Sequence, residues 1–272
     1  MSEKQEYVLG EHAAELARLG LQHRAWRARA LDLWRRGGLR AGARVLDFGC
    51  GPGYAALDLA EIVGPGGRVL AVDRSEAFLA HLRHEAAARG VATITTREED
   101  VARPGLALEQ VDFAWARWIF AFTPNLDASL DAFTAAIAPG GVAAVQEYIE
   151  YAAWRLLPEE PAVTLFLGRV MESWRARGGE PNVASAVLAG LSRRGFDILD
   201  VLPVCDAATP QDPLWDWPES FVLGNVPRLV QLGDLQAAEG EAILAAWEAA
   251  RARPGVRMLA PLTGLILARK PG

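Results

Sequence analysis

The sequence has 272 residues, 51% of them hydrophobic and 23% charged, which excludes a disordered or collagen-like chain and allows one large domain or two small ones. Two cysteines, Cys50 and Cys205, are too few for a disulfide framework or a four-cysteine zinc site, so we expect a reducing, cytoplasmic setting. A formal charge of −6, a polar N-terminus and the lack of a long uncharged run predict no nucleic-acid partner, no signal peptide and no membrane span.

The first 40 residues have a helical composition, with a break expected at Gly20. We expect this segment to lie over the core as a lid. No repeat, low-complexity tract or long linker divides the chain, so residues 1–272 are predicted to form a single domain.

Short apolar runs then alternate with helical segments between residues 41 and 150. The pattern predicts strands at 44–48, 68–72, 91–96, 111–116 and 142–146, and helices at 54–63, 75–90 and 124–137. Pro139-Gly140-Gly141 is expected to close the last of these helices. Strands that alternate with helices on this scale imply an α/β fold whose mainly parallel sheet is covered on both faces.

The pattern is less regular over residues 151–272. Helices are predicted near 159–177 and 182–194 and between 218 and 252, and strands at 196–204 and 256–268. The last two strands could pair as an antiparallel edge of the sheet.

A glycine-rich loop, Asp47-Phe48-Gly49-Cys50-Gly51-Pro52-Gly53, joins the first strand to the following helix. Free backbone N–H groups and the crevice of an open α/β sheet coincide there, so the loop is a candidate ligand site. Asp73 follows the second predicted strand about 20 residues further on, where an acid can bind the two hydroxyls of a ribose. The bulky Tyr54, and Asp47 two residues before the first glycine, disfavour a dinucleotide such as NAD.

These residues resemble the first motif of the class I S-adenosylmethionine-dependent methyltransferases. The resemblance continues through Asp73-Arg74-Ser75, Glu99-Asp100-Val101, Val111-Asp112-Phe113 and Ala136-Ile137-Ala138-Pro139-Gly140-Gly141. It implies a Rossmann-like, seven-stranded, mainly parallel sheet in the order 3-2-1-4-5-7-6, with a helical N-terminal lid and an insertion after the fifth strand. It also implies S-adenosylmethionine as the cofactor and S-adenosylhomocysteine as its product.

The resemblance further assigns roles to individual cofactor-binding residues. Asp47 should hold the methionine amine, and Gly49, Gly51 and Gly53 should line the methionine and the ribose. Asp73 should bind the ribose hydroxyls, with Arg74 beside it. Asp100 should accept from the adenine amino group next to the Val101 backbone, Arg117 should line the methionine end, and Tyr7 should close over the cofactor.

Aromatic side chains follow the fourth and fifth strands at the edge where an acceptor should meet the methyl group. We expect Trp118, Phe122, Tyr148 and Tyr151 to bind a small acceptor. Glu147 is the first candidate for a general base and His23 an alternative. No metal is expected.

The predicted function is methyl transfer to a small apolar or aromatic acceptor, at oxygen, in natural-product biosynthesis. Residues 41–150 would bind the cofactor, and residues 151–272 would supply the acceptor-pocket helices and the last two strands. Methylation of carbon or nitrogen, an RNA or protein methyltransferase and a non-enzymatic adenosyl-ligand sensor remain alternatives. Arginine far outnumbers lysine, which favours a GC-rich bacterial source, and we expect a monomer or homodimer.

Overall fold

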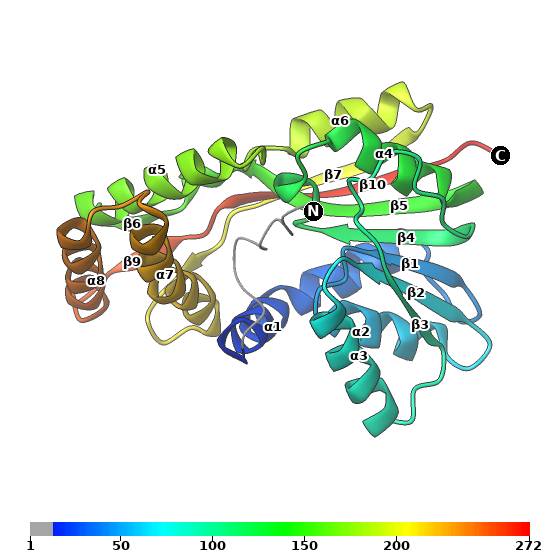
Figure 1. The fold of residues 1–272 in the computed structure, drawn as a ribbon, viewed down its shortest axis with the longest axis horizontal. Helices are drawn as coiled ribbons and strands as arrows, with labels where there is room; N and C mark the ends of the chain where they lie inside the picture. The colour runs from blue at the N-terminus through cyan, green and yellow to red at the C-terminus, as the bar shows by residue number, and fades with distance from the viewer. Residues whose placement is uncertain (1–12) are drawn as a thin grey trace, which may run out of the picture.

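A computed structural model describes residues 13–272, and its architecture confirms the expected α/β fold (Figure 1). The main sheet has seven strands in the order β3-β2-β1-β4-β5-β10-β7. Because β7 and β10 are the sixth and seventh strands of this sheet along the chain, the predicted order 3-2-1-4-5-7-6 is confirmed. Strands β1 to β5 are parallel, and β10 is antiparallel to both of its neighbours. The strands are β1 (Arg44–Phe48), β2 (Arg68–Asp73), β3 (Ile94–Glu98), β4 (Val111–Arg117), β5 (Ile137–Glu150), β7 (Asp197–Val204) and β10 (Leu262–Arg269).

Helices cover both faces of this sheet (Figure 1). Side chains alternate between the two faces along each strand, so Val45 and Trp115 join one core cluster while Leu46 and Phe48 join the other. The first cluster includes α1 (Ala13–Arg36), α2 (Tyr54–Val63) and α3 (Glu76–Ala88), and the second includes α4 (Leu126–Ala135) and α6 (Ala184–Arg193).

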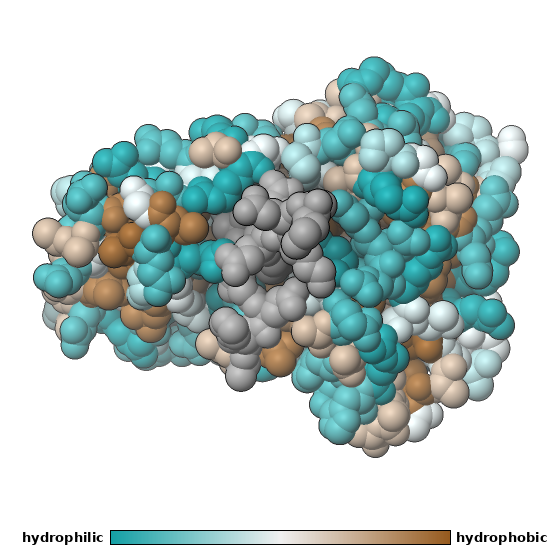
Figure 2. Space-filling view, viewed as in Figure 1, coloured by the Kyte–Doolittle hydropathy of each residue, from teal (hydrophilic) through white to brown (hydrophobic). Residues whose placement is uncertain are grey.

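Three further helices gather beyond the sheet, at the left in Figure 1: α5 (Pro161–Ala176), α7 (Pro213–Leu232) and α8 (Ala237–Arg251). A small sheet that the sequence did not predict lies with them, built from β6 (Arg155–Leu157), β9 (Arg257–Leu259) and β8 (Ala207–Ala208). Figure 2 shows hydrophobic patches on this end of the molecule, where Leu157, Leu165, Leu223 and Leu232 are exposed. Within residues 13–272, no helix combines the length and apolar character needed to cross a membrane.

Several predicted boundaries are wrong. Helix α1 runs through Gly20 without a break. The fourth helix ends at Ala135, so the segment Pro139-Gly140-Gly141 belongs to β5 and does not close the helix. Strand β3 lies three residues later than expected, and the last predicted strand is divided into β9 and β10.

Candidate cofactor and acceptor site

The glycine-rich loop is bound to the end of strand β2 by the carboxylate of Asp73. One oxygen of Asp73 accepts the Gly51 N–H at 2.8 Å, and the other accepts the Ser75 N–H at 2.9 Å. Burial raises the pKa of Asp73, while the two backbone donors oppose that rise. The predicted ribose-binding acid therefore lies against the loop at the carboxyl edge of the sheet, where α/β folds bind ligands.

The glycines of the loop differ in what surrounds them. A Cβ atom on Gly49 would meet the Ile119 side chain at 2.5 Å, and one on Gly53 would meet Leu82 at 2.3 Å. Nothing lies within 4 Å of the corresponding position on Gly51, which has a φ of 53°. Gly49 and Gly51 line the cavity, whereas Gly53 precedes α2 as its N-cap and does not. Gly51 is therefore the position where a ligand can approach the backbone.

Asp47 lies at the bottom of the loop, and one of its oxygens is buried without a partner among residues 13–272. Burial raises its pKa to about 7, an effect that the nearby charge of Arg117 opposes. An unpaired buried carboxylate oxygen is costly unless a ligand completes its hydrogen bonds. Asp47 therefore suits a cationic ligand group such as an amine.

A second, smaller cavity adjoins the first, and Gly49, Asp73, Ile119 and Phe122 line both. Asp100 and Val101 lie in the smaller cavity together with Arg74. The structure thus brings the predicted adenine-binding and ribose-binding residues to neighbouring positions. Tyr7 lies outside the described residues.

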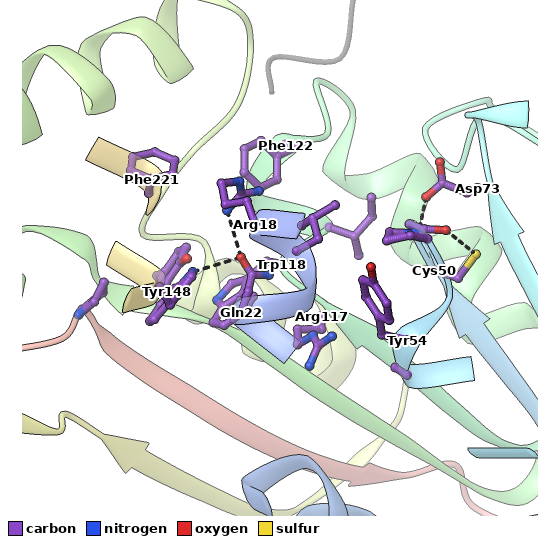
Figure 3. Close-up of a pocket in the computed structure, with 18 of the residues that line it drawn as sticks. Arg18, Gln22, Cys50, Tyr54, Asp73, Arg117, Trp118, Phe122, Tyr148 and Phe221 are labelled. Carbon is purple, nitrogen blue, oxygen red and sulfur yellow. Dashed lines mark hydrogen bonds between the residues drawn. The ribbon is translucent and has the colours of Figure 1, made fainter. Parts of the chain in front are cut away.

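The larger cavity is closed at its other end by aromatic side chains (Figure 3). The Trp118 ring stacks on those of Tyr148 and Trp217, each at 5.3 Å between centroids. All four predicted acceptor-binding residues line this aromatic wall, and their role toward an acceptor stays a prediction. The wall consists of Trp118, Phe122, Tyr148, Tyr151, Trp154, Trp174, Trp217 and Phe221.

Helix α1 contributes pocket residues that the sequence analysis missed. Arg18 and Gln22 line the cavity one helical turn apart, and the Gln22 side chain accepts from the Trp217 indole N–H at 3.1 Å (Figure 3). Their spacing on one helix face was the available signal, but the Trp217 partner of Gln22 lies 195 residues away in the sequence.

The predicted base Glu147 is fully buried beneath the turn that follows β4, and it does not line the cavity. One carboxyl oxygen accepts the backbone N–H groups of Ile119 and Phe120 at 2.9 and 2.7 Å. Burial raises the pKa of Glu147 to about 8 despite these donors. The turn begins at Trp118, whose φ of 49° is unusual for a residue other than glycine.

The alternative base His23 also lies outside the lining of the cavity. Its Nε2 is 3.1 Å from an Asp58 oxygen, and its Nδ1 is 3.3 Å from a guanidinium nitrogen of Arg117. Burial lowers the pKa of His23, so the imidazole is neutral at pH 7. A direct role as base stays a prediction for both His23 and Glu147.

Comparison with known proteins identifies the family that the core of this chain resembles. Residues 45–141 match the family described as a methyltransferase domain. The chain is 35% identical over 102 residues to nocamycin O-methyltransferase of Saccharothrix syringae, covering 38% of this chain and 36% of that protein. Residues 45–141 therefore form a methyltransferase domain, the type of domain that the sequence motifs predicted. S-adenosylmethionine is the cofactor of such a domain.

Two further similarities extend beyond this methyltransferase domain. The chain is 29% identical over 138 residues to aklanonic acid methyltransferase of a Streptomyces species, covering 49% of this chain and 63% of that protein. Both curated relatives are thus matched over less than two thirds of their length. The YcgJ protein of Bacillus subtilis has the same fold, with a TM-score of 0.62 at 14% identity over 92% of this chain and 99% of that one.

The residues of the methyltransferase domain fit S-adenosylmethionine. The open side of Gly51 admits a ligand to the backbone, and the unpartnered oxygen of Asp47 suits its amine. Asp73 lies where the two cavities meet, between the residues predicted for the methionine and those predicted for the adenine.

Proposed function

We propose that this protein transfers a methyl group from S-adenosylmethionine to an oxygen of a small apolar or aromatic acceptor. The observation that carries the proposal is a single cavity lined at one end by the cofactor loop and at the other by the aromatic wall. A methyl donor and an acceptor held in one cavity are aligned by the protein and shielded from water, which accounts for much of the catalysis of such a transfer.

The cofactor residues have separable roles in this proposal. Asp47 binds the methionine amine, Gly49 and Gly51 line the methionine and ribose, and Asp73 binds the ribose hydroxyls. Asp100 and Val101 receive the adenine, with Arg74 at the rim. When bound, the cofactor supplies a methyl group already activated by its sulfonium.

The acceptor side supports a small, apolar ligand. Helices α5 and α7 contribute Trp174, Trp217 and Phe221 to the aromatic wall, in agreement with an acceptor-binding role for residues 151–272. Flat aromatic surfaces favour a planar acceptor. The names of the two curated relatives, an O-methyltransferase of nocamycin and a methyltransferase of aklanonic acid, support methylation of a bacterial natural product, and the first of them supports oxygen as the acceptor atom.

Calorimetry with S-adenosylhomocysteine and with NAD tests the cofactor. We expect binding of the first and none of the second, and the reverse result would reject the proposal. A metabolite screen with trideuteromethyl-labelled S-adenosylmethionine then tests transfer, and NMR of the labelled product distinguishes oxygen from carbon or nitrogen. Cofactor binding with no labelled product from any acceptor that binds would favour an adenosyl-ligand sensor instead.

A further inference from the structure

We infer that the acceptor binds as an anion, a carboxylate or an acidic enol on a planar apolar skeleton, and that Arg117 holds its charged oxygen. The inference rests on the proposed function and names its substrate class. It is carried by the arrangement of Asp58, His23 and Arg117 and by the set of ionisable groups in the cavity.

The described part of the cavity offers no free base at its aromatic end. Two of its titratable groups, Asp47 and Asp73, belong to the cofactor side. At the aromatic end, burial raises the pKa of Tyr148 and Tyr151 far above neutrality, so neither phenol is a proton acceptor. The titratable groups that line the cavity are Arg18, Asp47, Cys50, Tyr54, Asp73, Arg117, Tyr148 and Tyr151.

Two cationic side chains, Arg18 and Arg117, line the described part of the cavity. Arg18 donates two hydrogen bonds to the Glu15 carboxylate, at 2.7 and 2.6 Å, so a carboxylate already balances its charge. The hydrogen-bond partner of Arg117 is instead the imidazole of His23, at 3.3 Å. The other terminal nitrogen of Arg117, Nη1, has no hydrogen-bond partner in residues 13–272.

The imidazole of His23 fixes the direction of the Arg117 guanidinium. The Asp58 carboxylate accepts from Nε2 of His23, which leaves Nδ1 as an acceptor facing Arg117. His23 is therefore a positioning residue. Burial lowers the pKa of Arg117 to about 10, so the group remains a cation at neutral pH.

Arg117 lies between the cofactor side and the aromatic end of the cavity (Figure 3). Its guanidinium carbon lies 5.8 Å from the centroid of the Trp118 ring, a member of the aromatic wall. The acid on the cofactor side whose charge acts on Arg117 is Asp47, which the proposed function commits to the methionine amine. With that amine in place, Arg117 needs another anion to balance its charge. The acceptor takes this role, and the methionine carboxylate of the cofactor is the alternative that the binding test separates from it.

Because the acceptor oxygen is already ionised, no proton has to be removed from it during the methyl transfer. A lone pair of the acceptor oxygen forms the new C–O bond while the S–CH₃ bond breaks and its electron pair stays on sulfur. The negative charge of the acceptor and the positive charge of the sulfonium cancel, which gives a neutral ester or enol ether and S-adenosylhomocysteine. The product no longer carries the charge that Arg117 binds, which favours its release.

The test compares 2-naphthoate with 2-naphthamide, a planar acid and its neutral isostere. Binding is measured by quenching of tryptophan fluorescence, with and without saturating S-adenosylhomocysteine. We expect the wild-type protein to bind naphthoate at least tenfold more tightly than naphthamide, and Arg117→Met to reduce this ratio to within twofold. Arg117→Lys, which keeps the charge, should retain a ratio above threefold, and it serves as the second variant if Arg117→Met fails to fold.

Arg27→Met is the matched control. Arg27 is an exposed arginine that binds Asp58, as His23 does, but it does not line the cavity. This variant should keep the wild-type ratio. Equal binding of the two probes to the wild type, or a ratio that survives Arg117→Met, overturns the inference. A loss of S-adenosylhomocysteine affinity in Arg117→Met with the ratio intact would instead assign Arg117 to the methionine end. An acid preference without S-adenosylhomocysteine binding would reject the proposed function alone.

Discussion

The side-chain carboxyl of Glu147 accepts the backbone N–H of Phe120 at 2.7 Å, from a position beneath the cavity. The same oxygen accepts from Ile119, so one side chain of β5 holds the turn that begins at Trp118. These bonds stabilise the positive φ of Trp118, and this conformation presents its ring to Tyr148 and Trp217.

Glu147→Gln should flatten the pH dependence of stability. The folded-state pKa of Glu147, about 8, lies above its ordinary value of 4.5, so the folded protein keeps a proton that the unfolded chain loses. The stabilisation is full below pH 4.5 and is lost as the pH rises through 8, by roughly 3–5 kcal/mol. Urea unfolding at several pH values in this range measures the loss. The variant should show a smaller decrease, and an unchanged decrease would contradict the prediction. Glu98→Gln, an exposed carboxyl on β3, is the control.

The same variant tests the predicted base. A general base at this position would make the substitution lower kcat by ~10²–10⁴-fold and remove an ionisation from the pH–rate profile. A carboxyl that only holds the turn would leave every ionisation in place and raise KM for the acceptor.

Asp73→Ala should weaken binding of S-adenosylhomocysteine by about 1.5–3 kcal/mol, because it removes a charged acceptor for the ribose and the anchor of the Gly51 N–H. Calorimetry measures the change. Asp112→Ala, at the opposite edge of the sheet in an exposed pair with Arg44, should leave the affinity unchanged. Equal affinities of Asp73→Ala and wild type would move the ribose site elsewhere.

Gly51→Ala and Gly42→Ala form a matched pair. Both glycines have positive φ values, 53° and 80°, and a Cβ would meet nothing within 4 Å at either position. Each alanine should therefore destabilise the fold by a similar amount, about 1–2 kcal/mol. Only Gly51 lines the cavity of the cofactor loop, so only Gly51→Ala should weaken S-adenosylhomocysteine binding, by at least tenfold. A similar loss of affinity in Gly42→Ala would show that strain rather than contact is responsible.

Hydrogen exchange tests the lid role of α1. The Leu16 carbonyl accepts from the Tyr54 hydroxyl at 3.0 Å, and Arg18 and Leu19 line the cavity. We expect amides of α1 to exchange at least several-fold more slowly with S-adenosylhomocysteine bound, because the ligand fills the space beneath the helix. The amides of β4, in the middle of the sheet, are the internal reference. Equal protection of α1 in both states would contradict a lid.

The features that local sequence determines were predicted correctly. The alternation of strand and helix, the glycine-rich loop and the acid that ends β2 each follow from neighbouring residues. Gly20 shows where this reasoning fails. The helix continues through it, and the Tyr54 ring packs beside it, with the hydroxyl at an ordinary van der Waals distance of 3.4 Å from the position of a Cβ at Gly20. Packing between distant residues outweighed the low helix propensity of glycine.

The division of the last strand has a similar cause. Pro261 has no N–H to continue a ladder, and the Ala260 N–H donates to the Asp206 carbonyl at 2.8 Å. The chain therefore leaves the small sheet there before it enters the main sheet as β10. Two further features depend on residues far apart in the sequence, which hydrophobic periodicity does not relate. They are the contact of Gln22 with Trp217 and the hydrogen bonds that link Asp58 through His23 to Arg117.

Helix α1 touches both ends of the cavity, through Leu16 against Tyr54 on the cofactor side and through Gln22 against Trp217 on the acceptor side. If α1 becomes ordered on ligand binding, as a lid would, the conformational entropy of that ordering is lost once, whichever ligand arrives first. The two ligands are consequently expected to bind cooperatively, and thermodynamic reciprocity requires each to tighten the other by the same factor.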